Sequence, residues 1–481
     1  MTSDAGTIAG NAGPGDGVPV LAGPAVAGPA VAGNAVARPA VAGTALPPDG
    51  RRTVGTGLPG GEPPAGPLLG DLAQVRARGR LRGVAALLGP AFVAAVAYVD
   101  PGNFATNFSA GAVSGYSLAW VIVAANLMAM LVQYLSAKAG VATGRDLPQL
   151  CRAHLPRAAS RGLWVQAELI AMATDVAEFV GAAIGLNLLF RVPLLASGLI
   201  TAVVAFAILG LQQRGYRRFE LAVAGLLGIV LLGFAYDLVA VHPSGSAMAA
   251  GLVPGFGSPD GLLLAVGIIG ATVMPHVIYL HSALTKGRVT CRSDAQRREL
   301  LRFQRLDVVI ALGAAGLVNL AMLFVAAALL GHAGRAGRLA AGSLSAAHAD
   351  LGRMVGGGAA LAFAVALLAS GLSSSSVGTY AGQVVMQGFI GRSVPLFVRR
   401  GLTMLPALIV LGVGLPPTTS LVISQVVLSF GIPFALVPLV ALTRRPDVMG
   451  ALVNRRVTTW AAGCTAALII GLNVYLLAST L

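Results

Sequence analysis

Apolar stretches as long as a lipid bilayer is thick recur through most of this 481-residue chain, beginning near residue 84. A helix needs roughly 20 such residues to cross the hydrocarbon core. Eleven stretches can be counted, at residues 84–109, 116–137, 163–189, 192–211, 219–240, 260–284, 306–331, 355–388, 401–414, 418–442 and 458–479. We therefore predict an all-α polytopic membrane protein with eleven transmembrane helices.

The composition excludes several classes of function. With 56% hydrophobic and 11% charged residues, the chain cannot cover a water-exposed surface, so the lipid bilayer is its solvent. The net charge of +15 does not indicate nucleic-acid binding, because Lys and Arg fall in short connections between the apolar stretches. Neither lysine follows a glycine, so there is no G-K-[ST] phosphate loop for ATP, and the three cysteines form no C-x-x-C pair. We expect no cofactor.

The distribution of Lys and Arg predicts the orientation. The tail and alternate connections carry 29 of these residues, whereas the other connections carry only Arg191, Arg335, Arg338 and Arg353. Connections rich in Lys and Arg stay in the cytoplasm. We therefore predict a plasma-membrane protein whose N-terminus is cytoplasmic and, after eleven crossings, whose C-terminus is outside.

The chain divides into a tail and a transporter domain. Residues 1–75 are rich in Ala, Gly, Pro and Val, which predicts a disordered cytoplasmic tail that is dispensable for transport; weak partner binding is the alternative. The transporter domain is predicted at residues 84–479. Within it, 84–240 and 260–442 would be two repeats, and 458–479 an extra helix.

Two of the apolar stretches are interrupted in the middle. The residues D-P-G-N at 100–103 cut the first, and M-P-H at 274–276 cut the sixth. Proline removes a backbone donor and glycine weakens a helix. An offset of five crossings reverses direction, as an inverted repeat of five plus five helices requires. Unwound backbone at membrane depth is buried in protein or lines a cavity, so each break predicts a site, although proline can also cause a plain kink.

The residues at the breaks suggest a cation site. Asp100 offers a carboxylate, Asn103 an amide oxygen and Met274 a thioether, and carbonyls near Ala97 and Ala271 would be freed by the breaks. Oxygen ligands alone suit magnesium or calcium, whereas a thioether favours softer first-row ions. Methionine in an apolar helix is commonly packing filler, but an aspartate at membrane depth is costly to bury and indicates function.

Three further acids lie on one stripe of the third stretch. Glu168, Asp175 and Glu178 fall within an arc of about 80° at 100° per residue. Buried carboxylates must be protonated, paired or hydrated, which suggests a proton path. The alternative is a structural ion pair with Arg399 or Arg400, which we expect for Asp175 in addition to any relay.

Five other residues in the apolar stretches are either open to two interpretations or expected to serve packing. His276 adjoins the second break, and His281 follows five residues later; we favour proton handling or gating for His276 over metal ligation. Gln425 either ties helices together or lends an oxygen to the ion. Gly181 and Gly185 are expected to permit close helix packing.

The two motifs also point to a family. D-P-G-N, M-P-H and the stretches VDPGNFATN, AMATDVAEF, GATVMPH, YLHSAL, SSSSVGTYAGQVVMQGF and SQVVLSFGIPFAL resemble the Nramp family of proton-coupled divalent metal transporters. The resemblance covers about residues 84–479. It implies a LeuT-type 5+5 inverted repeat with eleven helices, of which helices 1 and 6 are unwound.

The resemblance also implies roles for particular residues. It implies a metal site of Asp100, Asn103, Met274, Ala97, Ala271 and Gln425. It implies a proton pathway of Asp100, Glu178, His276, Asp175 with its partner Arg400, and Glu168 and Arg288 towards the cytoplasmic exit. The family often has Asn after the M-P-H histidine, whereas this chain has Val277, so the surroundings of the site differ there. Relatives that carry magnesium or aluminium lack the methionine, so Met274 favours manganese or iron.

We therefore expect a transporter and not an enzyme. It would import Mn²⁺ or Fe²⁺, with Co²⁺ and Cd²⁺ as further substrates, coupled to protons by alternating access, and the monomer would be the functional unit. The alternative is an ion-coupled symporter of a small organic solute on the same fold. An intramembrane enzyme is disfavoured because the chain has neither an H-E-x-x-H zinc motif nor a serine-base arrangement.

Overall fold

The computed structural model describes residues 69–480 apart from 78, 80–82, 84–85, 214–215, 257–260, 331–342 and 393. These residues belong to one compact unit, Gly57–Leu481. Within them no β-strand is present beyond an isolated bridge between Asp71 and Thr290. Most of the predicted tail, residues 1–68, lies outside the described residues. Its last residues include a short helix, α1 (Leu72–Ala77).

Every predicted apolar stretch corresponds to one helix or to a broken pair, which confirms the predicted fold class. In order these are α3 (Pro90–Ala97) with α4 (Pro101–Ser114), α5 (Ala119–Thr143), α7 (Arg157–Phe190), α8 (Leu194–Gln213), α9 (Tyr216–Val241), α11 (Gly261–Thr272) with α12 (Pro275–Thr285), α13 (Asp294–Leu330), α16 (Gly357–Ile390), α17 (Leu396–Val413), α18 (Pro417–Thr443) and α20 (Arg456–Thr480). Short helices connect them: α6 (Leu147–His154), α10 (Gly245–Ala250), α15 (Leu344–Met354), α19 (Pro446–Met449) and the 3-10 helix η1 (Gly450–Leu452).

Eight spans in the described part of the chain are long and apolar enough to cross a membrane, and α8 contains a shorter apolar segment, Leu194–Ile208. The largest boundary difference is at α13, which begins at Asp294 and not near residue 306. Its first turns are rich in Arg, Gln and Glu, which favour helix as strongly as Leu does. Hydropathy therefore detected only the part of this helix that is apolar.

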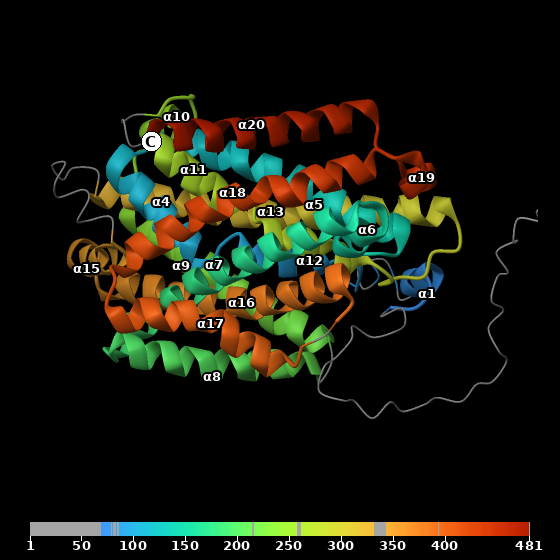
Figure 1. Cartoon of the computed structure of the whole chain (residues 1–481). Helices are drawn as coiled ribbons and strands as arrows, with labels where there is room; N and C mark the ends of the chain where they lie inside the picture. The colour runs from blue at the N-terminus through green and yellow to red at the C-terminus, as the bar shows by residue number, and fades with distance from the viewer. Residues whose placement is uncertain are drawn as a thin grey trace, which may run out of the picture. The chain divides into compact units, whose positions relative to one another are not determined.

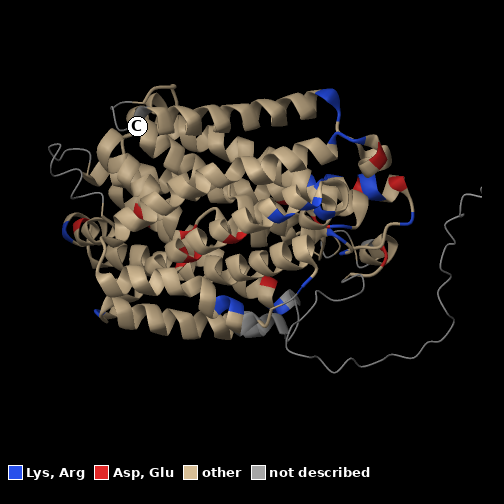
Figure 2. Ribbon diagram, in the orientation of Figure 1, with Lys and Arg blue, Asp and Glu red and all other residues tan. Residues whose placement is uncertain are grey.

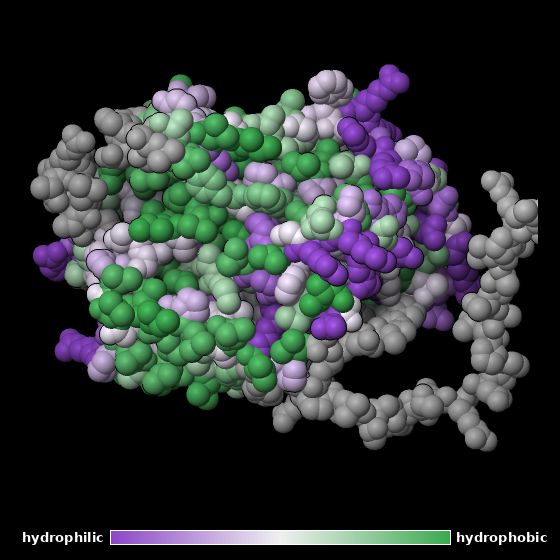
Figure 3. All heavy atoms as spheres, viewed as in Figure 1, coloured by the Kyte–Doolittle hydropathy of each residue, from purple (hydrophilic) through white to green (hydrophobic). Residues whose placement is uncertain are grey.

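The surface divides into an apolar body and a basic end. Hydrophobic residues cover much of the face shown in Figure 3, as expected of a protein surrounded by lipid. Lys and Arg gather at the end of the bundle where α1, α6 and α19 lie, and few lie at the end with α15 (Figure 2). The helices run between these two ends, with α8 and α20 at opposite edges of the bundle (Figure 1).

In the interior, the second half of the first broken helix packs against two long helices. Phe104 and Phe108 of α4 pack against Phe234 of α9 and Phe363 of α16, with ring centroids 5.0–6.3 Å apart. These mostly edge-to-face contacts fix α4 just beyond the break.

Two glycines of α7 permit the close packing that the sequence predicted. A Cβ at Gly181 would lie 1.9 Å from Cβ of Pro101, and one at Gly185 would lie 2.8 Å from the backbone nitrogen of Leu368. The first contact places the start of α4 directly on α7.

Candidate functional site

The first break lies between α3 and α4, where Asp100 acts as the N-cap of α4. Its Oδ1 accepts hydrogen bonds from the backbone nitrogen of Asn103 (2.8 Å) and from Asn103 Nδ2 (2.7 Å). Its Oδ2 is buried and has no hydrogen-bond partner among the described residues. A carboxylate that is 1% exposed therefore keeps one oxygen available.

Side chains from other helices hold the unwound backbone at this break. Asn319 of α13 donates to the carbonyl of Tyr98 (2.8 Å), and Ser370 of α16 donates to that of Val99 (2.6 Å). Pro101 lies four residues after Ala97 and has no N–H, so the Ala97 carbonyl cannot accept the usual helical bond. Sequence reasoning missed Asn319 and Ser370, although the SSSS stretch beside Ser370 was part of the family pattern.

The second break lies between α11 and α12 and repeats this arrangement. Met274 is the N-cap of α12 and is completely buried, and Pro275 begins the helix. Pro275 lies four residues after Ala271, so the Ala271 carbonyl is also freed. Asn103 Nδ2 donates a hydrogen bond of 3.0 Å to this carbonyl. The two breaks, about 170 residues apart in sequence, therefore touch in space.

Gln425 of α18 lies against both broken helices. A Cβ at Gly102 would lie 1.8 Å from Gln425 Nε2, and one at Gly270 would lie 2.1 Å from the Gln425 carbonyl oxygen. The amide thus fills the space left by the missing side chain of Gly102. Its Oε1 is buried without a hydrogen-bond partner in the described part of the chain. This position is compatible with both interpretations of Gln425, since the residue joins helices and also presents a free oxygen.

Taken together, the breaks offer donors for a small cation. They provide the second Asp100 oxygen, the Gln425 amide oxygen, the Met274 sulfur and the carbonyls of Ala97 and Ala271. The C-terminal ends of α3 and α11 also point here, and such ends carry partial negative charge. Val277, where the family often has Asn, is completely buried beside His276 and adds no polar group.

The three acids of α7 meet different partners. Asp175 accepts a 2.7 Å bond from Arg400, which also contacts Ser375 and lies 4.9 Å from the centroid of the Phe179 ring. Of the two expected candidates, Arg400 is therefore the partner of Asp175. The neighbouring Arg399 pairs with Glu168 instead.

Of the other two acids, only Glu168 has a cationic partner among the described residues. Arg399 Nη2 lies 2.8 Å from Glu168 Oε2, so this acid is compensated. Glu178 is 1% exposed, and its Oε2 has no hydrogen-bond partner among the described residues. Its carboxyl lies against Gly378 of α16, where a Cβ would be 2.9 Å from it. Glu178 is therefore the acid of this stripe that no cation holds within the described chain.

The two histidines of α12 have separate surroundings. His276 Nδ1 lies 3.3 Å from the Thr174 hydroxyl of α7, and its Nε2 is buried without a partner in the described region. His281 Nδ1 lies 3.0 Å from Gln133 Oε1, and Gln133 Nε2 donates to the Tyr98 hydroxyl (2.6 Å). His276 thus contacts α7 at Thr174, one residue before Asp175 and four before Glu178, whereas His281 is linked to the first break through α5.

The basic end of α3 is clamped by Asp307 and Glu220, which the sequence did not single out, and by Arg288, which it did. Asp307 of α13 accepts bonds from the backbone nitrogens of Gly89 (3.1 Å) and Ala91 (2.9 Å). Arg288 pairs with Glu220 of α9 at 2.6 Å, and its other terminal nitrogen reaches the carbonyl of Ala86 at 3.4 Å. Arg288 and Glu168, which the resemblance placed together towards the exit, therefore belong to separate ion pairs.

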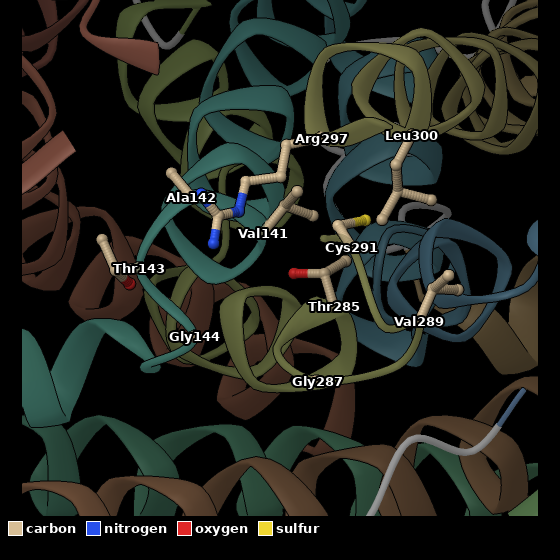
Figure 4. Close-up of a pocket in the computed structure, with 10 residues that line it drawn as sticks. All are labelled: Val141, Ala142, Thr143, Gly144, Thr285, Gly287, Val289, Cys291, Arg297 and Leu300. Atoms are coloured by element: carbon tan, nitrogen blue, oxygen red, sulfur yellow. The ribbon is translucent and has the colours of Figure 1, made fainter. Parts of the chain in front are cut away.

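Thiolate or histidine metal centres find no support in the described region. No three His, Cys, Asp or Glu side chains gather there as a metal ion would require. A cavity of about 200 Å³ at the basic end, drawn in Figure 4, is lined by Thr285, Cys291 and Arg297 among others and contains none of the predicted site residues. Burial raises the pKa of the Cys291 thiol, and it raises that of Cys151 to about 12, so both stay protonated.

A bundle of membrane-spanning helices with two discontinuous helices in contact at its centre defines a membrane transporter. The chain belongs to the Nramp family, since the family model described as natural resistance-associated macrophage protein-like matches residues 91–479. The divalent metal cation transporter MntH of Bacillus subtilis is 50% identical over 411 residues, which cover 85% of this chain and 96% of that one. The chain is thus a transporter and not an enzyme.

Solved structures agree with this assignment. A point variant of the Eremococcus coleocola manganese transporter matches with a TM-score of 0.75 and 32% identity, over 83% of this chain and 87% of that one. A transporter of the nucleobase-cation-symport-1 family matches with a TM-score of 0.54 and 16% identity, over 81% of this chain and 92% of that one. The second likeness concerns the fold alone and supports the LeuT-type architecture.

Proposed function

We propose that this chain imports divalent transition metals, chiefly Mn²⁺ and Fe²⁺, together with protons by alternating access. The observation that carries the proposal is the contact between the two breaks. The Asn103 bond to the Ala271 carbonyl joins the two breaks, three residues before Met274. Asp100 and Gln425, which packs against Gly102 and Gly270, each keep a buried oxygen without a partner among the described residues. Relatives of this chain are named divalent metal cation and manganese transporters, and these names support divalent metal ions as the substrate.

In this proposal the metal ion is bound by a mixed set of donors. Asp100 supplies the charge, and Asn103, Gln425 and the freed carbonyls of Ala97 and Ala271 replace water. Asn103 would turn its amide oxygen towards the ion, which needs a change from the bond it now makes to Ala271. Met274 adds a soft ligand that favours Mn²⁺, Fe²⁺, Co²⁺ and Cd²⁺ over Mg²⁺ and Ca²⁺.

Alternating access would require α3 to move. The clamp formed by Asp307 and by the pair of Arg288 with Glu220 holds its basic end. We propose that this end faces the cytoplasm, because Lys and Arg gather there (Figure 2). The C-terminal end of α20 lies at the opposite end (Figure 1), so in this proposal the C-terminus would lie outside a plasma membrane. One chain contains every proposed ligand, so the monomer would be the transporting unit.

Protons would pass along the acidic stripe. Asp100 and Glu178 each have an oxygen without a partner in the described part, and His276 lies between α12 and α7 with a free nitrogen. The pair of Asp175 with Arg400 and that of Glu168 with Arg399 would continue the path along α7.

Glu178→Gln is expected to separate proton movement from metal binding. The amide cannot ionise, so manganese-dependent proton entry should fall to the level of empty vesicles while manganese still binds. A pH-sensitive dye inside proteoliposomes and calorimetric binding measure the two quantities. Glu299→Gln, the same substitution at the start of α13, is the control and should behave as wild type. Undiminished proton entry in Glu178→Gln would remove this residue from the pathway.

Uptake by the purified protein tests the function itself. Radiolabelled manganese should enter proteoliposomes, faster when the outside is more acidic, and iron(II) should compete. Cadmium should also compete, because it binds thioether ligands well. Uptake that ignores the pH gradient would contradict proton coupling. Indifference to all of these ions, with uptake of an organic solute instead, would favour the alternative symporter.

A further inference from the structure

A cavity lined by cations lies at the basic end of the bundle, away from the two breaks. It measures about 590 Å³ and lies between the end of α5, the start of α13 and the segment from η1 to the start of α20. Five of its lining residues are basic and none is acidic: Lys138, Arg298, Arg302, Arg305 and Arg455. We call this cavity the basic pocket. A concentration of positive charge around a cavity of this size fits an anionic ligand.

The cations of the basic pocket lack carboxylate partners within the described chain. In the same part of the sequence, Lys286 pairs with Asp146, Arg288 with Glu220, Arg292 with Asp71 and Arg297 with Asp294. The ion pairs formed by the described residues include none from the five cations of the pocket. Lys286, Arg288, Arg292 and Arg297 are thus neutralised locally, whereas the cations that line the pocket have no carboxylate partner among the described residues.

Neutral groups hold two of these cations in place. Lys138 is only 7% exposed, and its Nζ donates a 2.8 Å bond to Asn454 Oδ1. The guanidinium carbon of Arg305 lies 5.1 Å from the centroid of the Tyr134 ring. A buried ammonium with only an amide as partner is costly unless an anion approaches it. Lys138 and Arg305 are therefore already held in place for such an anion, which lowers the entropy lost on binding.

The surroundings of the basic pocket favour a lipid as the source of the anion. On α13, Arg298, Arg302 and Arg305 share one helix face with Leu306 and Val309, which are 45% and 49% exposed. This face changes from basic to apolar within one turn, as expected where a helix enters the bilayer.

On α5 and α20, too, exposed apolar residues lie next to the basic residues that line the pocket. Leu127 of α5, 60% exposed, lies seven and eleven residues before Tyr134 and Lys138 and so on the same face of its helix. On α20, Val457 and Trp460 are 79% and 74% exposed and lie close in sequence to Arg455 of the pocket lining. Tryptophan is typical of the membrane interface. Exposed apolar surface thus lies next to the cations on all three elements, as expected of side chains at headgroup depth.

We propose that the basic pocket binds the phosphate of an anionic phospholipid, whose acyl chains lie along α5 and α13. Basic pockets between transmembrane helices on the cytoplasmic side suit such headgroups. On the opposite face of α13, Asp307 follows Arg305 by two residues and holds Gly89 and Ala91 in the α3 clamp. A bound lipid would therefore restrain the first turns of the helix that carries this clamp.

Binding of lipid to the full-length protein tests the proposal. The protein in phosphatidylcholine nanodiscs, or in micelles for native mass spectrometry, is titrated with phosphatidylglycerol, cardiolipin or phosphatidylcholine. We expect selective binding of the two anionic lipids. Arg298→Gln with Arg302→Gln should weaken it on the order of 30-fold, because each cation near an anionic headgroup contributes roughly fivefold. Arg455→Gln, on the opposite wall, should weaken it about fivefold.

The matched control is Arg157→Gln with Arg161→Gln. These two arginines are exposed on α7, lie four residues apart as Arg298 and Arg302 do, and remove the same charge. Their variant should bind anionic lipid as wild type does. Equal loss in both double variants would show general surface attraction and overturn the proposal. Inorganic phosphate or glycerol phosphate that displaces the lipid at equal concentration would overturn it too, because the acyl chains would then contribute nothing.

Discussion

Asp100→Asn is expected to lower manganese uptake at least about 100-fold and to weaken manganese binding similarly. Loss of a partner outside the first coordination shell already costs about 10–100-fold in metal affinity, and Asp100 is the only charged group proposed to touch the ion. The substitution preserves the shape and the N-cap of α4, because asparagine caps a helix as well as aspartate does. The effect should therefore fall on binding and transport, and not on folding.

The control for this variant is Asp237→Asn. Asp237 of α9 is also completely buried and has both oxygens without hydrogen-bond partners in the described region, so the chemical change is the same. Radiolabelled uptake into proteoliposomes, calorimetric binding and the thermal unfolding midpoint are measured for both variants. If Asp100→Asn and Asp237→Asn transport manganese equally, Asp100 is not a ligand and the proposed site is wrong.

Met274→Leu is expected to change selectivity more than it changes transport. Leucine keeps the volume of this buried side chain, and such exchanges usually cost less than about 1.5 kcal/mol of stability. The loss of sulfur should weaken cadmium binding at least about tenfold, weaken manganese binding less, and increase competition by magnesium and calcium, which prefer oxygen ligands. Competition against radiolabelled manganese uptake measures all four ions in one assay.

Met322→Leu is the matched control for the sulfur. Met322 of α13 is also completely buried, and its sulfur lies 3.7 Å from Asn107 Nδ2 and not at the breaks. The order of the four ions should stay as in wild type in this variant. If Met274→Leu keeps the wild-type preference for cadmium, the Met274 sulfur is not a ligand of the ion and serves only packing.

The sequence alone determined the helices and the positions of both breaks. A bilayer requires long apolar stretches, so hydropathy finds them without tertiary information. Pro101, Gly102 and Pro275 interrupt a helix through their own backbone chemistry, which acts locally. The acidic stripe of α7 could be predicted for the same reason, because helix geometry places Glu168, Asp175 and Glu178 on one side. The true start of α13 was missed because polar residues continue a helix without any hydropathy signal.

Only the tertiary structure decided which groups meet. Helix geometry and residue chemistry do not distinguish Arg399 from Arg400 as the partner of Asp175, since both occupy one short segment more than 200 residues away; only the family resemblance named Arg400. Asn319 and Ser370 support the first break, and Gln425 lies against Gly102, only because separate helices pack side by side. A helix break arises from interactions within a few residues, whereas an ion pair or a carbonyl's partner depends on how distant segments fill space together.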